Sequence, residues 1–168
     1  MKKIIVICLM SIIGLVGVQA QLAKMQALYL LQFAKNTSWP REDSGSPFVI
    51  TVIGDKDLVS ELKTVASSKT IGNRKIEVVS SSSVSGLSKS DIIFLGEKSC
   101  SQMSDLLTEQ SGKTVLLVAG KKGLCSQGAG ISFVPDGGKL NYEISEGNIA
   151  KNGLKVTQKI VSLAKQVL

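Results

Sequence analysis

Two cysteines, Cys100 and Cys125, are the residues of this chain whose type and placement suggest chemistry most directly. Each shortly follows a predicted parallel strand, so we expect both on loops at the same edge of a sheet. The third cysteine, Cys8, lies in an N-terminal segment that we expect to be removed. In an oxidising compartment a remaining pair usually bonds. We therefore predict a disulfide between Cys100 and Cys125.

This predicted disulfide has a structural and a redox interpretation. It closes a loop of 24 intervening residues, which the chain-entropy account values at roughly 3 to 4 kcal/mol. A redox switch is the alternative, although the Cys-x-x-Cys spacing that lowers the pKa of a thiol is absent. The structural interpretation is favoured, and the redox interpretation stays open.

Catalytic chemistry has little support in this sequence. Histidine is absent, which excludes serine or cysteine catalysis with an imidazole base and removes the commonest metal ligand. The nearest acidic pairs, Glu42–Asp43 and Asp55/Asp57, lie where a turn or the start of a helix explains them. We predict no catalytic residues, no metal site, no cofactor and no enzymatic activity.

Three glycine-bearing fragments resemble phosphate loops at first sight: GEKS at 96–99, SGKT at 111–114 and AGKKG at 119–123. A phosphate loop needs a further glycine five places before its Gly-Lys pair, a preceding strand and a following helix. SGKT has Leu107 in place of that glycine and runs into a predicted strand. GEKS lacks the adjacent Gly-Lys pair. Nucleotide binding is therefore not predicted.

The first 20 residues have the three parts of a secretory signal peptide. Lys2 and Lys3 precede an apolar run that ends at Val18, and Val18-Gln19-Ala20 supplies a small-residue end. This run of about 15 residues is short for a membrane-spanning helix, which needs roughly 20. We expect cleavage after Ala20, export, and one domain over residues 21–168.

Net charge argues against nucleic acid as a partner. Without Lys2 and Lys3, the 20 basic residues become 18 against 13 acidic residues, a balance of +5. The lysines are scattered, and no tract is denser than Lys121–Lys122. A nucleic-acid binder is expected to show a basic groove with interleaved aromatic residues. We predict a mildly basic domain that binds no nucleic acid.

Apolar periodicity predicts alternating helices and strands. Helices are predicted at 21–36, 55–68 and 101–110, strands at 48–54, 75–79, 91–96 and 114–120, a serine-rich loop at 80–90, a hairpin from 130–134 and 139–144, and a closing helix at 146–168 that Gly153 bends or splits. Pro40 ends the first helix and Asp55 caps the second. Near-continuous apolar strands that alternate with helices indicate a mostly parallel sheet. The predicted fold is a single-domain α/β three-layer sandwich with helices on both faces and an antiparallel C-terminal hairpin at one edge.

Three of the seven aromatic residues gather near the predicted mature N-terminus: Tyr29, Phe33 and Trp39. Tyr29 and Phe33 have helical spacing, which favours packing of the first helix on the sheet. Trp39 stands at a turn fixed by Pro40, and a rigid tryptophan is typical of interface hot spots. All three are candidates for partner binding, with Phe33 inside and Trp39 near the rim.

Several short motifs follow one another along the chain. They are Ala27, Tyr29, Leu30, Phe33-Ala34-Lys35 and Trp39-Pro40, then Ile53-Gly54-Asp55, and finally 130–134, Tyr142-Glu143-Ile144, Ala150, 153–156 and Leu163-Ala164. In order and spacing they resemble the YfiR family of bacterial periplasmic proteins over nearly the whole predicted mature chain. Two features depart from the family. Ser145 follows Tyr142-Glu143-Ile144 where members commonly have Phe-Glu-Ile-Asn, and one cysteine pair is available where some members have two disulfides.

The resemblance implies a non-catalytic regulator in the periplasm. The best-known member binds the periplasmic part of a membrane diguanylate cyclase and restrains cyclic-di-GMP synthesis. It is relieved by an outer-membrane lipoprotein or by loss of its disulfides. The resemblance also makes a homodimer plausible.

A periplasmic small-molecule-binding protein is the alternative. Such a binder is expected to have a deep pocket at the carboxyl ends of the strands, around Gly54, Gly96 and Gly120.

Overall fold

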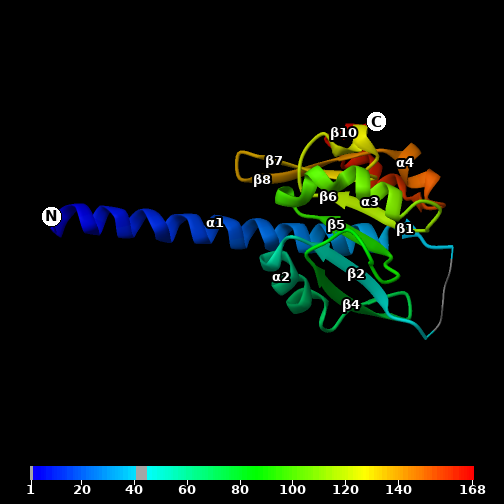
Figure 1. The fold of residues 1–168 in the computed structure, drawn as a ribbon, viewed down its shortest axis with the longest axis horizontal. Coiled ribbons are helices and arrows are strands. Elements are labelled where there is room, and N and C mark those ends of the chain that lie inside the picture. The colour runs from blue at the N-terminus through cyan, green and yellow to red at the C-terminus, as the bar shows by residue number, and fades with distance from the viewer. Residues whose placement is uncertain (1, 41–44) are drawn as a thin grey trace.

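The computed structural model describes residues 2–40 and 45–168, with side chains from residue 19 onward. The acidic pair Glu42–Asp43 lies outside the described residues. Helix α1 (Lys2–Lys35) begins within the predicted signal segment, and its N-terminal part projects from the domain as a rod (Figure 1). Ala23 is the first buried side chain along α1 in the described part. Among the described residues, no helix has both the length and the apolar character needed to cross a membrane.

An eight-stranded sheet forms the middle layer of the domain, in the order β10-β8-β7-β6-β5-β2-β4-β3. Its strands are β2 (Phe48–Ile53), β3 (Thr70–Ile71), β4 (Arg74–Ser81), β5 (Ile92–Leu95), β6 (Leu116–Ala119), β7 (Ile131–Asp136), β8 (Lys139–Ile144) and β10 (Gln166–Val167). Strands β4, β2, β5, β6 and β7 run parallel. β8 is antiparallel to β7, and β3 is antiparallel to β4. The predicted mostly parallel sheet is confirmed.

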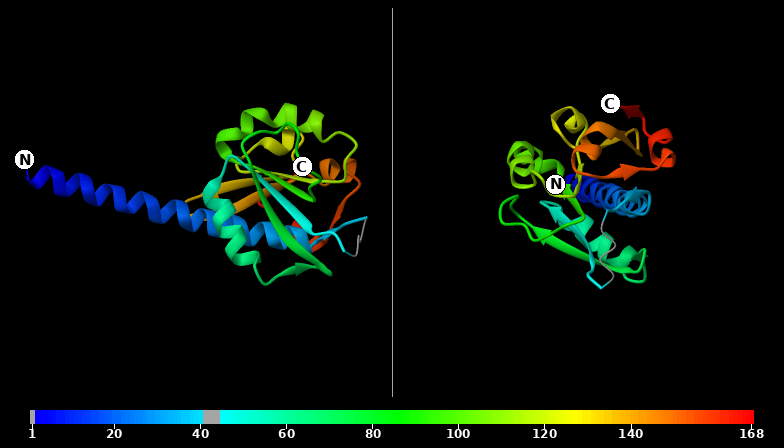
Figure 2. Two further views of the ribbon diagram at one scale, coloured as in Figure 1. Left: turned by 60° about the horizontal axis from the view of Figure 1, so that its bottom comes forward. Right: turned by 90° about the vertical axis from the view of Figure 1, so that its right-hand side faces the viewer.

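Helices cover both faces of this sheet (Figures 1 and 2). One face packs against α1 and α2 (Lys56–Ala66), and the other packs against α3 (Met103–Glu109) and the 3₁₀ helix η1 (Glu97–Gln102). Alternate residues of β5 show the two layers: Ile92 and Phe94 belong to the first core, whereas Ile93 and Leu95 belong to the second. A strand buried on both faces must be apolar throughout, which explains the continuous apolar runs. The predicted three-layer α/β fold is confirmed.

Local signals place α2 and the loop after β4 as predicted. Asp55 is the N-cap of α2, and its Oδ1 accepts a hydrogen bond from the backbone N–H of Leu58 at 2.9 Å. The serine-rich segment after β4 forms no further helix or strand before β5. Val84, in the middle of this segment, is buried in the core beside α3 and holds the loop to the domain.

The C-terminal region differs from the single closing helix that periodicity predicts. It forms α4 (Glu146–Lys151), β9 (Lys155–Val156), α5 (Gln158–Ser162) and β10. Gly153 splits the predicted helix because its φ of 72° is left-handed, a conformation that ends helices. β9 pairs antiparallel with β1 (Thr37–Ser38), and β10 pairs parallel with β8. The hairpin of β7 and β8 therefore does not form the edge of the sheet, because β10 lies outside it.

Candidate functional site

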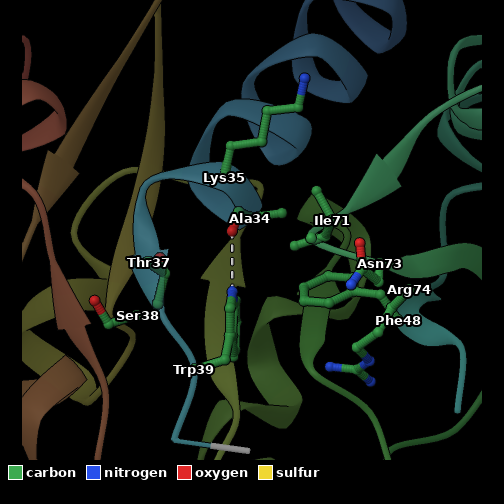
Figure 3. A pocket seen from close by; sticks show the side chains of 10 residues that line it. Ala34, Lys35, Thr37, Ser38, Trp39, Phe48, Ile71, Asn73 and Arg74 are labelled. Atoms are coloured by element: carbon green, nitrogen blue, oxygen red, sulfur yellow. Dashed lines mark hydrogen bonds between the residues drawn. The ribbon is translucent and has the colours of Figure 1, made fainter. Parts of the chain in front are cut away.

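A cleft of about 420 Å³ lies where α1 ends beside the amino ends of β2 and β4 (Figure 3). Three segments form it: the end of α1 with the turn that follows, the start of β2, and the turn between β3 and β4. The lining residues are Ala34, Lys35, Thr37, Ser38, Trp39, Phe48, Ile71, Gly72, Asn73 and Arg74. The partner-binding candidate Trp39 is therefore part of the wall of a cleft.

Trp39 is held in place as part of the cap of α1. The last carbonyl groups of a helix have no partner within the helix. The indole Nε1–H of Trp39 donates to the carbonyl of Ala34 at 2.9 Å, and the Thr37 hydroxyl donates to the carbonyl of Phe33 at 2.8 Å. The Asn36 side chain donates to a third carbonyl one residue earlier. The half-buried indole consequently has a fixed position and no free donor.

Phe48 forms the floor between Trp39 and Arg74. The rings of Trp39 and Phe48 meet edge to face, with centroids 5.0 Å apart and an interplanar angle of 79°. The guanidinium carbon of Arg74 lies 5.1 Å from the centroid of the same ring, in cation–π contact. Phe48 has no exposed surface. The cleft is therefore built on an aromatic base that the first residue of β2 supplies.

Arg74 connects the segment around Phe48 to the neighbouring strands of the sheet. Its Nη1 and Nη2 donate to the two carboxylate oxygens of Asp91 at 2.9 and 2.7 Å, which is a bidentate pair. Its Nε and Nη2 also donate to the carbonyls of Ser46 and Pro47. Asp91 in turn accepts from the backbone N–H of Val49 at 2.8 Å. One ion pair thus joins the entry to β2, the start of β4 and the residue before β5.

The other two aromatic candidates lie in the core. Phe33 has no exposed surface, and its ring is 5.0 Å from Tyr142 and 5.9 Å from Phe133. Tyr29 is half-buried and meets the ring of Tyr142 at 5.5 Å. Burial, together with Tyr29, raises the pKa of Tyr142 to about 12, and its hydroxyl donates to the carbonyl of Ile160 at 2.6 Å. Of the three candidates, Trp39 alone lines the cleft.

Cys100 and Cys125 are free, buried thiols in the structure. The Cys100 thiol donates to the carbonyl of Gly96 at 3.4 Å. The Cys125 thiol donates to the carbonyl of Glu143 at 3.6 Å and accepts from the Ser132 hydroxyl at 3.3 Å. Each sulfur has its own hydrogen-bond partners, and the predicted disulfide is not formed here. The pairing of Cys100 with Cys125 stays a prediction.

Both thiols are weak acids in the folded protein. Burial raises the pKa of Cys125 to about 11, although the Ser132 hydroxyl acts in the opposite direction. Burial also raises the pKa of Cys100, against the lowering effect of a backbone hydrogen bond from Gly120. Because the thiolate is the reactive form, both groups are slow nucleophiles at neutral pH.

The carboxyl ends of the central strands, where a small-molecule-binding protein would have its pocket, are filled by the chain itself. A Cβ atom placed on Gly54 would lie 2.2 Å from Ser99 Oγ, and one placed on Gly96 would lie 2.8 Å from the carbonyl oxygen of Ile53. At Gly120 the nearest backbone atom would be 3.0 Å away. These glycines let η1 approach the strand ends. The cleft beside Trp39 is at the opposite, amino end of the strands.

Sequence analysis missed Phe48, Arg74 and Asp91 as site residues. Arg74 is the first residue of β4, and Asp91 directly precedes the apolar run of β5. Opposite charges at the amino ends of two parallel strands are a usable signal for an ion pair. The signal is weak, because single charged residues beside strands are usually solvated. Phe48 gave no signal beyond that of a strand residue.

Comparison with known proteins adds a family and a fold. A family profile described as YfiR/HmsC-like matches residues 23–165. No curated protein matches the chain. A conserved domain protein from Vibrio cholerae O1 biovar El Tor is similar in structure at 10% identity, with a TM-score of 0.61, over 87% of this chain and 60% of that one. The ABC domain in complex with L-Trp from Streptococcus pneumoniae is similar at 13% identity, with a TM-score of 0.56, over 72% of this chain and 55% of that one. At these identities the similarity shows the fold alone, and this chain spans less than two thirds of either structure.

Proposed function

This chain belongs to the YfiR/HmsC-like family, and on that premise we propose that it is a periplasmic protein that binds and restrains a membrane diguanylate cyclase. The family match over residues 23–165 is the observation that carries the proposal. Restraint requires no catalytic group, because a regulator that binds one state of its target more tightly than another shifts the target toward that state. An outer-membrane lipoprotein that competes for the regulator, and a homodimer of this chain, belong to the same proposal.

Trp39 is the residue that we propose for contact with the cyclase. Tryptophan is enriched among the residues that dominate binding energy at interfaces. Trp39 is half-buried, fixed by its hydrogen bond to Ala34, and set in the wall of a cleft. Tyr29 and Phe33 support this contact indirectly, because they anchor α1 to the hairpin of β7 and β8.

A redox gate is a further part of the proposal. Bond formation between Cys100 and Cys125 transfers two electrons and two protons to a disulfide oxidant of the compartment, and both sulfurs leave their present hydrogen bonds. Thiol labelling of the denatured, unreduced protein tests it. Absence of reactive thiols supports the bond, and two free thiols per mature chain refute it. If a Cys100→Ser variant restrains the cyclase as well as the wild type does, the redox gate is refuted.

The test of the main proposal combines capture and signalling. Residues 21–168 serve as bait for detergent-solubilised membranes, and retained proteins are identified by mass spectrometry. Intracellular cyclic-di-GMP is measured in a deletion strain. We expect a retained diguanylate cyclase and a rise in cyclic-di-GMP. Unchanged cyclic-di-GMP with no retained membrane protein would end the cyclase proposal. A retained partner of another class would keep the regulator and change its target.

A periplasmic small-molecule-binding protein is the second candidate. The observation that favours it is the cleft, because its volume of about 420 Å³ falls in the range of roughly 300 to 1,000 Å³ that is usual for ligand sites. A ligand that binds the folded state raises the melting temperature by mass action. A thermal-shift screen with amino acids, nucleotides and organic acids is the check. If no compound gives a saturable rise, this candidate is withdrawn.

A further inference from the structure

We propose that the cleft beside Trp39 is the docking point for the membrane partner, and that it takes an extended acidic segment anchored by one apolar side chain. This inference deepens the function proposed above and rests on it, since it names where the partner is held and by what chemistry. Apolar walls, a lining without acidic residues, and an unpaired strand edge beside the cleft support it.

The walls of the cleft suit an apolar anchor. Trp39 forms one side, and Ile71 and Phe48 lie across from it in Figure 3. Because the indole N–H is already bonded to Ala34, Trp39 presents an apolar surface to a ligand. Burial of an apolar side chain against such walls is the favourable contact that they offer. The volume of about 420 Å³ admits such a side chain together with the adjoining main chain.

The lining has a hydrogen-bond donor for a negatively charged group, although Asp91 already balances the charge of Arg74. Its charged residues are Lys35 and Arg74, and none of its ten residues is an aspartate or glutamate. Of the N–H donors of Arg74, one on Nη1 has no acceptor among the described residues, since the others bond to Asp91, Ser46 and Pro47. The residue is only 9% exposed, and Figure 3 shows its guanidinium directed toward the side of Trp39. A carboxylate from the partner would accept from this donor.

An unpaired strand edge favours an extended segment over a compact ligand. β3 is the last strand of the sheet and pairs with Arg74 and Lys75 of β4. The outer side of β3 has no partner strand in the described part of the chain. Ile71, the last residue of β3, lines the cleft. A segment seated beside Trp39 can therefore continue along β3 through main-chain hydrogen bonds, the usual mode of β-strand addition.

Trp39 is the sole tryptophan of the chain, so its fluorescence reports on the cleft directly. The probes are acetyl-Glu-Leu-Glu-Phe-Glu-amide, the same peptide with lysine in place of glutamate, and free benzoate, titrated into residues 21–168. We expect a saturable change with the acidic peptide and binding at least about tenfold weaker with the basic one. Equal binding of both peptides, or no binding of either, would overturn the proposal. If benzoate binds as tightly as the acidic peptide, the cleft is a small-molecule site instead.

Two matched variants locate the binding. Asn73→Phe replaces an exposed lining residue by a ring and leaves Trp39, Phe48 and Arg74 in place. Ser111→Phe adds the same ring to an exposed turn after α3. Neither adds a tryptophan, so fluorescence remains usable, and circular dichroism verifies that both fold. We expect Asn73→Phe to weaken the acidic peptide at least about tenfold and Ser111→Phe to leave it unchanged. A folded Asn73→Phe protein that binds like the wild type refutes the docking site.

Capture from membranes separates this inference from the function on which it rests. If the wild-type bait retains the cyclase and Asn73→Phe does not, both stand. If both baits retain it, the cleft is not the docking point, although the regulator remains. If the wild type retains no cyclase, the proposed function fails. The assignment of the docked segment to a cyclase then fails as well.

Discussion

Arg74 joins three segments of the chain through one guanidinium group, and its pair with Asp91 is almost buried, with side chains 9% and 14% exposed. Removal of one partner from such a pair leaves an uncompensated charge, at a cost of about 3 to 5 kcal/mol. We expect Asp91→Ala to lower the free energy of unfolding by about 3 kcal/mol, measured by urea denaturation. The loss includes the bond that Asp91 accepts from Val49.

The exposed pair of Lys165 and Asp136 is the matched comparison. Its side chains are 48% and 57% exposed, and the hydrogen bond from Lys165 lowers the pKa of Asp136. Solvent screens such a pair, and exposed pairs contribute little to stability. Asp136→Ala should leave the urea midpoint unchanged. Equal losses in the two variants would contradict the role assigned to Arg74 and Asp91.

Trp39 gives a second prediction for a single residue. Trp39→Phe keeps an aromatic ring against Phe48 and removes the donor to the carbonyl of Ala34. A typical hydrogen bond contributes about 1 kcal/mol, so we expect a loss of that size in the free energy of unfolding. Far-UV circular dichroism in urea is the suitable measurement, because the variant has no tryptophan. An unchanged midpoint would show that the cap on α1 does not need the indole.

Cys125 gives a prediction for alkaline pH. The ordinary pKa of a thiol, 9.0, is raised by burial to about 11 in the folded protein. Between these values the unfolded chain loses a proton that the folded chain keeps. Stability is therefore complete below pH 9 and falls as the pH rises toward 11, by about 3 kcal/mol at most.

Urea midpoints at pH 7.5, 9 and 10 check this expectation. Cys125→Ala removes this thiol and should reduce the decline over that range. Cys100 and Tyr142 stay in both proteins. Burial raises the pKa of Cys100 as well, and the Tyr142 pKa of about 12 adds its own decline above pH 10. Parallel pH profiles for the variant and the wild type would exclude Cys125 as the cause.

Alanine substitutions at two glycines that lie at the ends of elements distinguish the cost of backbone strain from the cost of a steric clash. Gly54 and Gly153 have φ values of 73° and 72°. A left-handed alanine costs roughly 1 to 2 kcal/mol, and Gly153→Ala should lose about that, since the nearest atom to its Cβ would be 3.8 Å away. Gly54→Ala should lose more, because its Cβ would meet Ser99 Oγ at 2.2 Å. Adding Ser99→Ala to Gly54→Ala should recover part of the extra loss in urea denaturation.

If Ser99→Ala is merely additive with Gly54→Ala, the close contact between η1 and β2 is not the source of the larger loss. A double-mutant cycle measures this directly, because residues in contact give a non-zero coupling energy.

Elements with strong local signals could be predicted from the sequence. Strands β2, β5 and β6 are short apolar runs, and α2 has an aspartate cap and helical spacing. The C-terminal region could not, because its strands depend on distant partners. β9 exists through pairing with β1, and β10 through pairing with β8. The helical spacing within 146–168 does not indicate those partner strands. Gly153 was the local sign that the predicted closing helix is interrupted.

At the scale of the whole molecule, the sequence located one wall of the cleft and missed the rest. Trp39 stood out because it is the sole tryptophan and precedes a proline. Phe48 and Arg74 reach the same place from other segments, and Asp91 is 17 residues beyond Arg74. Each looks ordinary within its own segment. A site assembled from three segments is readable from one sequence only when the fold is already known.

The boundary of the folded unit gives a prediction at this scale. The described side chains from Gln19 to Gln21 are exposed, and burial begins at Ala23. Removal of residues 1–20 should therefore leave the melting temperature unchanged. Removal of residues 1–31 also deletes the buried Ala27 and Leu30 and should abolish cooperative melting. Calorimetry of the two truncated proteins checks this, and a stable product of the longer deletion would contradict the role of α1 in the core.

The packing of α1 against the β7–β8 hairpin determines when α1 can be buried if the chain crosses a membrane N-terminus first. Tyr29 and Phe33 emerge early, but their partners Phe133 and Tyr142 emerge near the end. Contacts between segments so far apart in sequence form late and slowly. The apolar face of the first helix therefore stays exposed to solvent until most of the chain has been translocated. If the protein is exported as proposed, we expect a periplasmic chaperone to shield that face until the hairpin has been translocated.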